Sequence, residues 1–167
     1  KEVAVSGKRK RTQVDQIAVL DNGAGMNAEI LRQSLQFGVG EHLDDRAGMG
    51  RFGMGLPNSS ISQACHVDVW SWENGLSSTF YSYLDVTDIA NGDMSEVPKP
   101  KKEPIPPRWA EAANKIGKSG TLVVWSQIDR CAWKTSNAIV RNCEEIVGRL
   151  YRRFINDGRV EIRLASF

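Results

Sequence analysis

The sequence is most informative at one stretch, Val19-Leu20-Asp21-Asn22-Gly23-Ala24-Gly25-Met26. An apolar run ends here in a carboxylate, and two glycines follow at a spacing of two. The pattern predicts a buried strand and then a loop whose glycines permit positive φ and a close backbone approach to a flat ligand. A carboxylate at a strand end accepts hydrogen bonds, and an exocyclic amine is a suitable donor. The alternative is a plain turn in which Asp21 and Asn22 cap backbone groups.

A second glycine-rich stretch, Gly48-Met49-Gly50-Arg51-Phe52-Gly53-Met54-Gly55-Leu56, precedes a predicted short helix over residues 56–64. Exposed N–H groups at the N-terminus of a helix attract anions, phosphates above all. The stretch contains a G-x-G-x-x-G pattern, but residues 41–46 before it are polar and do not form the strand that a dinucleotide-binding unit needs. The sequence has no G-x-x-x-x-G-K-[ST], which excludes a P-loop.

Hydrophobic patterns on both sides of these stretches predict the remaining elements. Residues 3–5 and 17–20 are expected to form two strands joined around a basic loop. Asn27 is expected to cap a helix that carries Ile30, Leu31 and Leu35. Residues 67–72 and 79–84 predict a hairpin.

The second half of the chain changes character. Residues 88–119 hold five of the six prolines and predict an irregular insertion with one helical turn over 109–115. A short buried strand is expected over 121–125. A spacing of three and four from residue 139 to residue 154 predicts the clearest helix of the chain, and alternation over 159–167 predicts a last strand.

The composition bounds the class of protein. Of the 167 residues 41% are hydrophobic and 25% charged, which argues against a disordered chain. A net charge of +2 does not call for a nucleic-acid partner. The sequence contains neither a long apolar run nor a signal peptide, so no membrane partner is expected. The odd number of cysteines, Cys65, Cys131 and Cys143, favours a reducing, intracellular compartment such as the cytoplasm.

Together with Gly120-Thr121 at the start of a later strand, the two glycine stretches resemble the GHKL ATPase superfamily, which includes gyrase, the heat-shock chaperone, histidine kinases and MutL. Residues 21–26 are similar to its D-x-G-x-G adenine motif, and residues 50–56 to its G-x-x-G-x-G phosphate motif. Met26 and Phe52 are most similar to the chaperone and MORC branches, and the proline-rich insertion after Leu84 resembles the MORC branch. The resemblance covers roughly residues 3–154.

The resemblance implies ATP as the ligand and a role for each motif residue. Asp21 would accept a hydrogen bond from the adenine amino group, Gly23 and Gly25 would let the backbone approach the ring, and Met26 would pack on its face. Thr121 would support the adenine site, and residues 38–49 would form a mobile ATP lid. The residues that would wrap the phosphates are Gly50, Arg51, Phe52, Gly53, Met54, Gly55 and Leu56.

One family motif does not occur in the sequence, E-x-x-x-N, whose Glu activates water and whose Asn holds Mg²⁺. We expect that the sequence starts just after the helix that carries it, that the parent protein is an ATPase, and that this stretch binds ATP without useful hydrolysis. Glu41, Asp44 and Asp45 are the carboxylates nearest the phosphate motif. His66 and Asp68 face alike on a strand, but no third ligand is near, so no metal site is assigned.

The remaining charged residues are weaker candidates. The run Lys8–Arg11 could contact nucleic acid, although a solvated loop is the plainer interpretation. Arg51 is preferred to His42 and Arg46 as a phosphate contact, because it lies inside the motif and a guanidinium can bind two oxygens.

The predicted fold is therefore an α/β, two-layer Bergerat-type sandwich, with a mixed, mostly antiparallel sheet and helices on one face. Residues 1–157 would form the ATP-binding domain, and residues 158–167 would begin a transducer-like domain. In the intact protein, nucleotide-driven lid closure would drive a homodimeric clamp. Two alternatives stay open: a histidine-kinase catalytic domain, and a non-catalytic module for nucleotide binding or protein interaction.

Overall fold

A computed structural model of the chain describes residues 2–4, 10–38, 54–113 and 115–166, with side chains from residue 13 onward. The chain divides into two compact units. Unit 1 comprises residues 1–15 and 131–167, and unit 2 comprises residues 16–130. The predicted domain boundary at residue 157 stays a prediction.

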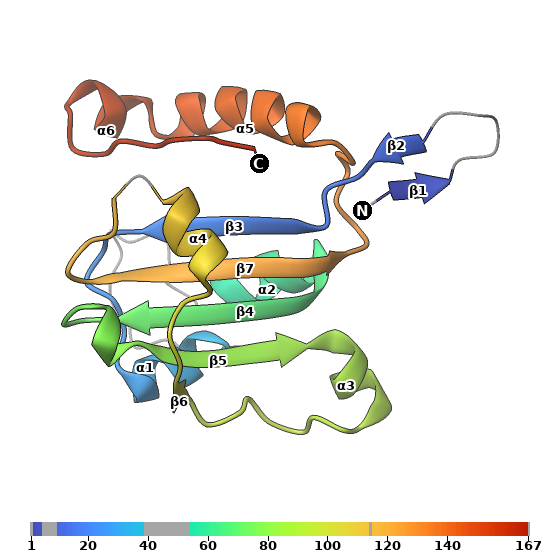
Figure 1. Cartoon of the computed structure of the whole chain (residues 1–167), viewed down its shortest axis with the longest axis vertical. Coiled ribbons are helices and arrows are strands. Elements are labelled where there is room, and N and C mark those ends of the chain that lie inside the picture. The colour runs from blue at the N-terminus through green and yellow to red at the C-terminus, as the bar shows by residue number, and fades with distance from the viewer. Residues whose placement is uncertain (1, 5–9, 39–53, 114, 167) are drawn as a thin grey trace. The chain divides into compact units, whose positions relative to one another are not determined.

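Unit 2 is built on a five-stranded antiparallel sheet with the strand order β3-β7-β4-β5-β6 (Figure 1). The long strand β7 lies between β3 and β4, and its register places Thr121 opposite both Asp21 and Ser71. The strands are β3 (Gln16–Asp21), β4 (Ala64–Trp72), β5 (Phe80–Asp85), β6 (Lys101–Lys102) and β7 (Gly120–Ile128).

Side chains that alternate along β4 supply two apolar clusters, one on each face of the sheet. On one face, Val67 and Val69 pack with Leu31 and Leu35, beside helices α1 (Ala28–Ser34) and α2 (Gly55–Ile61). Figure 1 shows both helices behind the sheet. The predicted α/β sandwich with a mostly antiparallel sheet is thereby confirmed.

The opposite face of the sheet carries the second cluster. Trp70 and Trp72 are buried there with Leu122 and Val124, and Trp109 packs against them. Trp109 lies in α4 (Pro107–Ala112), which crosses the front of the sheet in Figure 1. The insertion therefore contributes to the core on this face.

Two features of unit 2 that local sequence signals predict are present in the structure. The predicted cap is confirmed, because Asn27 Oδ1 accepts hydrogen bonds from the N–H groups of Glu29 and Ile30. The hairpin is confirmed as β4 and β5, with a 3₁₀ turn over Leu76–Ser78 in its loop.

The start of the irregular insertion was predicted wrongly. Helix α3 (Val86–Asn91) begins before residue 88, because Asp85 caps it and Gly92, at φ +81°, ends it. The insertion also contains β6, whose two residues pair with β5 at the edge of the sheet. The caps of α3 are local signals that the prediction missed, whereas β6 depends on a partner in β5, which a local pattern does not reveal.

The strands near the N-terminus differ from the prediction in number and in the way they are joined. Strand β1 (Glu2–Ala4) pairs with β2 (Lys10–Thr12), which forms inside the basic run, whereas β3 pairs with β7. Strands form near both predicted ranges, as β1 and β3, but they are not joined directly around a basic loop, because β2 forms between them. β3 pairs with β7 along one edge, and β1 pairs with β2 in a separate two-stranded sheet.

The long C-terminal helix is interrupted. It forms α5 (Ser136–Leu150) and α6 (Arg152–Asn156), because Tyr151, at φ −97° and ψ 8°, leaves the helical conformation. Residues 159–166 form neither helix nor strand, so the predicted last strand is wrong: alternation alone does not supply a pairing partner for its backbone groups.

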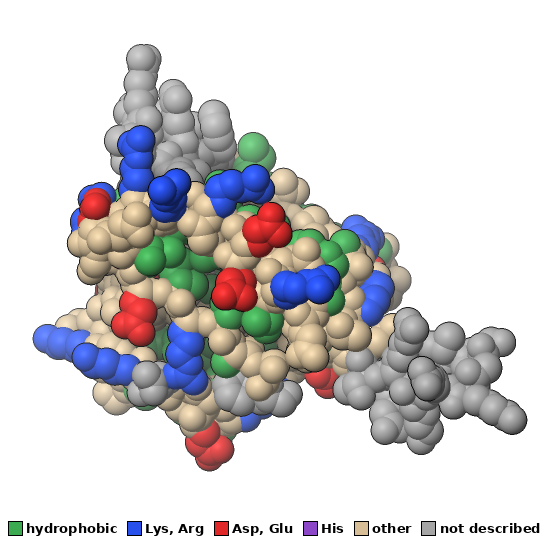
Figure 2. Space-filling model, turned by 90° about the horizontal axis from the view of Figure 1, so that it is seen from above, with side chains coloured by type: hydrophobic (Ala, Val, Ile, Leu, Met, Phe, Trp, Pro, Cys, Tyr) green, Lys and Arg blue, Asp and Glu red, His purple; other side chains and the backbone are tan. Residues whose placement is uncertain are grey.

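Apolar side chains are visible at the surface between charged ones in Figure 2. Within the described residues, no helix is both long and apolar enough to span a membrane.

Candidate functional site

Three adjacent strands of unit 2 place a row of polar side chains on one face of the sheet. Asp21 ends β3, Thr121 lies opposite it on β7, and Ser71 lies opposite Thr121 on β4. Since side chains alternate along strands, this row shares its face with Val67, Val69 and the helices α1 and α2. The sequence predicted Asp21 and Thr121 as site residues, and the register brings them together.

Asp21 is exposed, and its side chain caps a backbone N–H group, as the alternative of a plain turn predicts. Its Oδ1 accepts a hydrogen bond of 2.8 Å from the N–H of Gly23. Among the described residues, no hydrogen bond to the second carboxylate oxygen, Oδ2, is found. The turn therefore fixes one oxygen of the carboxylate and leaves the other available to a ligand. The role in adenine binding stays a prediction.

The loop after Asp21 is held against the ends of two neighbouring strands. Gly25 has φ +76°, and a Cβ at this position would overlap the carbonyl oxygen of Trp72. A Cβ at Gly120 would overlap the carbonyl oxygen of Asp21 in the same way. Both glycines are thus required by backbone packing around the site, a reason that is independent of any ligand.

Apolar side chains flank the polar row. Met26 is half-buried against the first apolar cluster, and its N–H donates a hydrogen bond of 2.8 Å to Ser71 Oγ. Val19, two residues before Asp21 on the same face, is 55% exposed. Sequence reasoning treated Val19 as part of a buried strand and named neither Val19 nor Ser71 as a site residue. The site thus combines hydrogen-bond acceptors with an exposed apolar surface, as a planar heterocycle requires.

The described residues include only one end of the predicted phosphate motif. Met54 is exposed and precedes α2 without a side-chain cap, and no atom of the described residues lies within 4 Å of a Cβ added at Gly55, the first residue of the helix. The side chain of Leu56 packs against the first apolar cluster. Gly50, Arg51, Phe52, Gly53 and residues 39–49 of the predicted lid lie outside the described residues.

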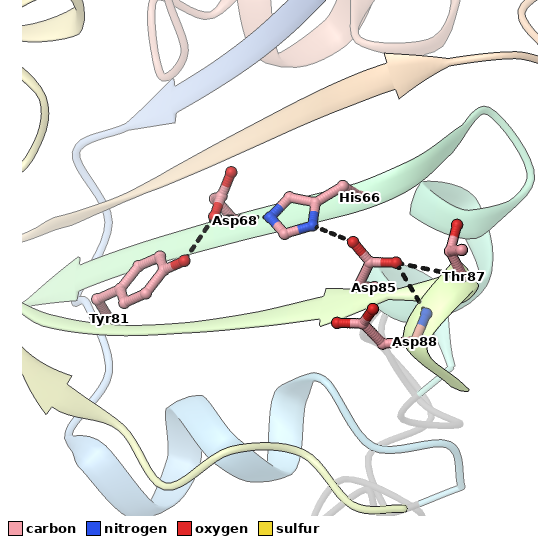
Figure 3. A network of polar contacts seen from close by, with 6 residues as sticks. All are labelled: His66, Asp68, Tyr81, Asp85, Thr87 and Asp88. Carbon is pink, nitrogen blue, oxygen red and sulfur yellow. Dashed lines mark hydrogen bonds and ion pairs between the residues drawn. The ribbon is translucent and has the colours of Figure 1, made fainter. Parts of the chain in front are cut away.

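A separate polar network lies on the other face of β4 (Figure 3). His66 Nδ1 is 2.8 Å from Asp85 Oδ2, and its Nε2 is 3.1 Å from Asp68 Oδ1. Tyr81 donates a hydrogen bond of 2.7 Å to the same oxygen of Asp68. Because a carboxylate accepts at each ring nitrogen, both nitrogens of His66 must carry a proton.

Charge and burial agree with this assignment. The hydrogen bond to Asp68 raises the pKa of His66 from 6.5 to about 9, against the effect of burial and with help from Asp85. Burial alone would raise the pKa of Asp85, but hydrogen bonds from His66 and from backbone N–H groups lower it. Within the described part of the chain, no three or more His, Cys, Asp or Glu side chains are grouped to hold a metal ion.

Comparison with known proteins identifies the family. No curated protein matches the chain. A family model described as histidine kinase-, DNA gyrase B- and HSP90-like ATPase matches residues 1–121, which include both glycine stretches and the Asp21–Thr121 pair. The antiparallel α/β sandwich agrees with the Bergerat fold of these enzymes. The chain therefore belongs to the histidine kinase-, DNA gyrase B- and HSP90-like family of ATPases, the GHKL ATPases.

Proposed function

We propose that this chain binds ATP on the helix-covered face of its sheet, with adenine at Asp21 and Thr121. The observation that carries the proposal is the register that sets these two residues opposite one another, beside the exposed apolar surface of Val19. Family membership implies ATP binding, and the acceptor groups suit the amino group of adenine. Gly23, Gly25 and Met26 would complete the adenine site.

We assign the triphosphate to residues 50–56, at the start of α2. The support is the glycine pattern, together with the absence of any described residue within 4 Å of a Cβ added at Gly55, the first residue of the helix. GHKL ATPases bind ATP together with Mg²⁺. The only carboxylate in the polar row is Asp21, which is assigned to adenine, so we assign no residue of this chain to the metal.

The nucleotide cycle is proposed on sequence grounds. Residues 38–49 would close over bound ATP, and closure would drive a homodimeric clamp of the kind found in the chaperone and MORC branches. The support is the glycine-rich composition of this segment and the proline-rich insertion of residues 88–119. Sedimentation of the protein with and without a non-hydrolysable ATP analogue tests this part: a monomer under both conditions would contradict a nucleotide-driven clamp.

Calorimetric titration with ATP tests the binding function. The variant Asp21→Ala removes the acceptor for the adenine amine, so we expect a loss of about 1–3 kcal/mol, or roughly 5- to 150-fold in affinity. Asp93→Ala removes another exposed carboxylate of unit 2 and serves as the matched control, with unchanged affinity expected. Equal binding by Asp21→Ala and the unsubstituted protein would refute the assignment of Asp21. No binding of ATP at all would favour the interaction module instead.

A further inference from the structure

Ser71 lies at the centre of the polar row and is fully buried. Its Oγ is 2.8 Å from the N of Met26, 3.0 Å from the carbonyl oxygen of Gly120 and 3.0 Å from Oγ1 of Thr121. One hydroxyl thus connects the adenine loop to the strand that carries Thr121. No motif of the sequence points to Ser71.

The three contacts fix the direction of each hydrogen bond. A serine hydroxyl has one proton to donate and two lone pairs. The carbonyl of Gly120 can only accept, so the Ser71 proton is directed to it, and the N–H of Met26 can only donate to Ser71. All three contacts can be hydrogen bonds at the same time only if Thr121 donates its proton to Ser71.

This arrangement decides what Thr121 offers to a ligand. Since its only proton is engaged by Ser71, its oxygen presents lone pairs. Asp21, its neighbour across the strands, carries an ionised carboxylate, which also accepts only. A ligand group placed between these two residues must therefore be a hydrogen-bond donor.

We propose that Ser71 is a positioning residue that holds the Thr121 hydroxyl as an acceptor, so that the site selects a 6-amino purine nucleotide over a 6-keto one. This inference rests on the proposed function and names the origin of its base specificity. Without the Ser71 hydroxyl, the Thr121 proton is free to turn toward a keto oxygen. Thr121 is only 8% exposed, and a buried acceptor that the wrong ligand leaves unpaired discriminates strongly against that ligand, so the discrimination would be relaxed.

The test compares the affinities of ATP and inosine 5′-triphosphate for the full chain. The two ligands share ribose and phosphates and differ at the 6-position of the purine. We expect the unsubstituted protein to prefer ATP, and Ser71→Ala to reduce that preference at least about fivefold. Ser71→Thr keeps the hydroxyl and should retain the preference. In a Thr121→Val background, Ser71→Ala should cause no further change.

Ser82→Ala is the matched control, because Ser82 is a buried serine on β5 whose hydroxyl donates to the carbonyl of Pro98, away from the row. It should leave the preference unchanged. If Ser71→Ala weakens both ligands equally, Ser71 has a structural role only and the inference is overturned. The same holds if the unsubstituted protein binds both ligands equally well. Binding of neither ligand by the unsubstituted protein refutes the proposed function, and the inference falls with it.

Discussion

Gly25 lies against the backbone carbonyl of Trp72 so closely that a Cβ at residue 25 would overlap the carbonyl oxygen. The contact joins the loop after Asp21 to the end of β4, and Gly25 makes it at φ +76°. An L-residue with a side chain meets two obstacles here, the left-handed conformation and the carbonyl. The geometry of the loop after Asp21 thus depends on a glycine, independently of any ligand.

We therefore expect Gly25→Ala to destabilise the fold by about 3 kcal/mol or more, as the sum of left-handed strain and overpacking. Gly92→Ala is the matched control: Gly92 also has a positive φ, +81°, but no atom of the described part of the chain lies within 4 Å of its added Cβ. It should cost only about 1–2 kcal/mol. Thermal or urea unfolding measures both values, and equal losses would show that the contact with Trp72 contributes nothing.

Gly55 allows the phosphate assignment to be tested without disturbing the fold. Its added Cβ would meet no atom of the described residues within 4 Å, and it begins α2, where alanine is at least as favourable as glycine. We expect Gly55→Ala to unfold like the unsubstituted protein but to bind ATP about tenfold more weakly, with adenosine binding unchanged, because the methyl group would intrude where backbone meets phosphate.

Gly148→Ala provides the corresponding control on α5, where an added Cβ also meets open space. It should leave the affinities for ATP and adenosine as they are. Equal weakening of both ligands by Gly55→Ala would place the phosphates elsewhere.

Sequence patterns predicted those features that depend on neighbouring residues. Asn27 caps α1 through N–H groups two and three positions ahead, which a local pattern captures. Asp21 and Thr121 were found because they stand in family motifs. Ser71 was missed because its importance arises from the register of β4 against β7, with Thr121 50 positions away. The capping role of Asp85 was missed as well, although its spacing to Gly92 resembles the start and end of a short helix.

The His66 network, on the face of β4 opposite Ser71, also depends on contacts that a local sequence pattern does not reveal. His66 and Asp68 could be placed on one face from their spacing alone. Their partners Tyr81 and Asp85 come from β5, and only the hairpin register brings the four together. The sequence assigned no metal site to His66 and Asp68, and in the structure His66 forms ion pairs with both Asp68 and Asp85.

The sequence predicts that ATP hydrolysis by this chain is negligible. The chain contains no Glu four residues ahead of an Asn, so we expect no useful ATP turnover in a phosphate-release assay. A positioned general base contributes about 10²- to 10⁴-fold to such a reaction. Metal-dependent turnover that is abolished by Glu41→Ala or Asp45→Ala would contradict this expectation and would identify the base in residues 38–49.

The His66 network predicts how stability depends on pH. The pKa of His66 is about 9 in the folded protein and 6.5 in the unfolded chain, so the protonated ring stabilises the fold fully below pH 6.5. This contribution is lost as the pH rises from 6.5 to 9. Asp85 acts in the opposite range: its lowered pKa gives stability above the ordinary carboxyl value of 3.8, lost as the pH falls through the folded value.

Unfolding measured across this range should therefore show a loss of about 3 kcal/mol between pH 6.5 and 9. His66→Gln removes the titrating group, so its stability should be lower at pH 6 and nearly flat over the same interval. Asp68→Asn removes the largest cause of the raised pKa, so the loss should be smaller and should end nearer pH 6.5. An unchanged slope in His66→Gln would mean that another group takes up the proton and that His66 is not the charged centre of the network.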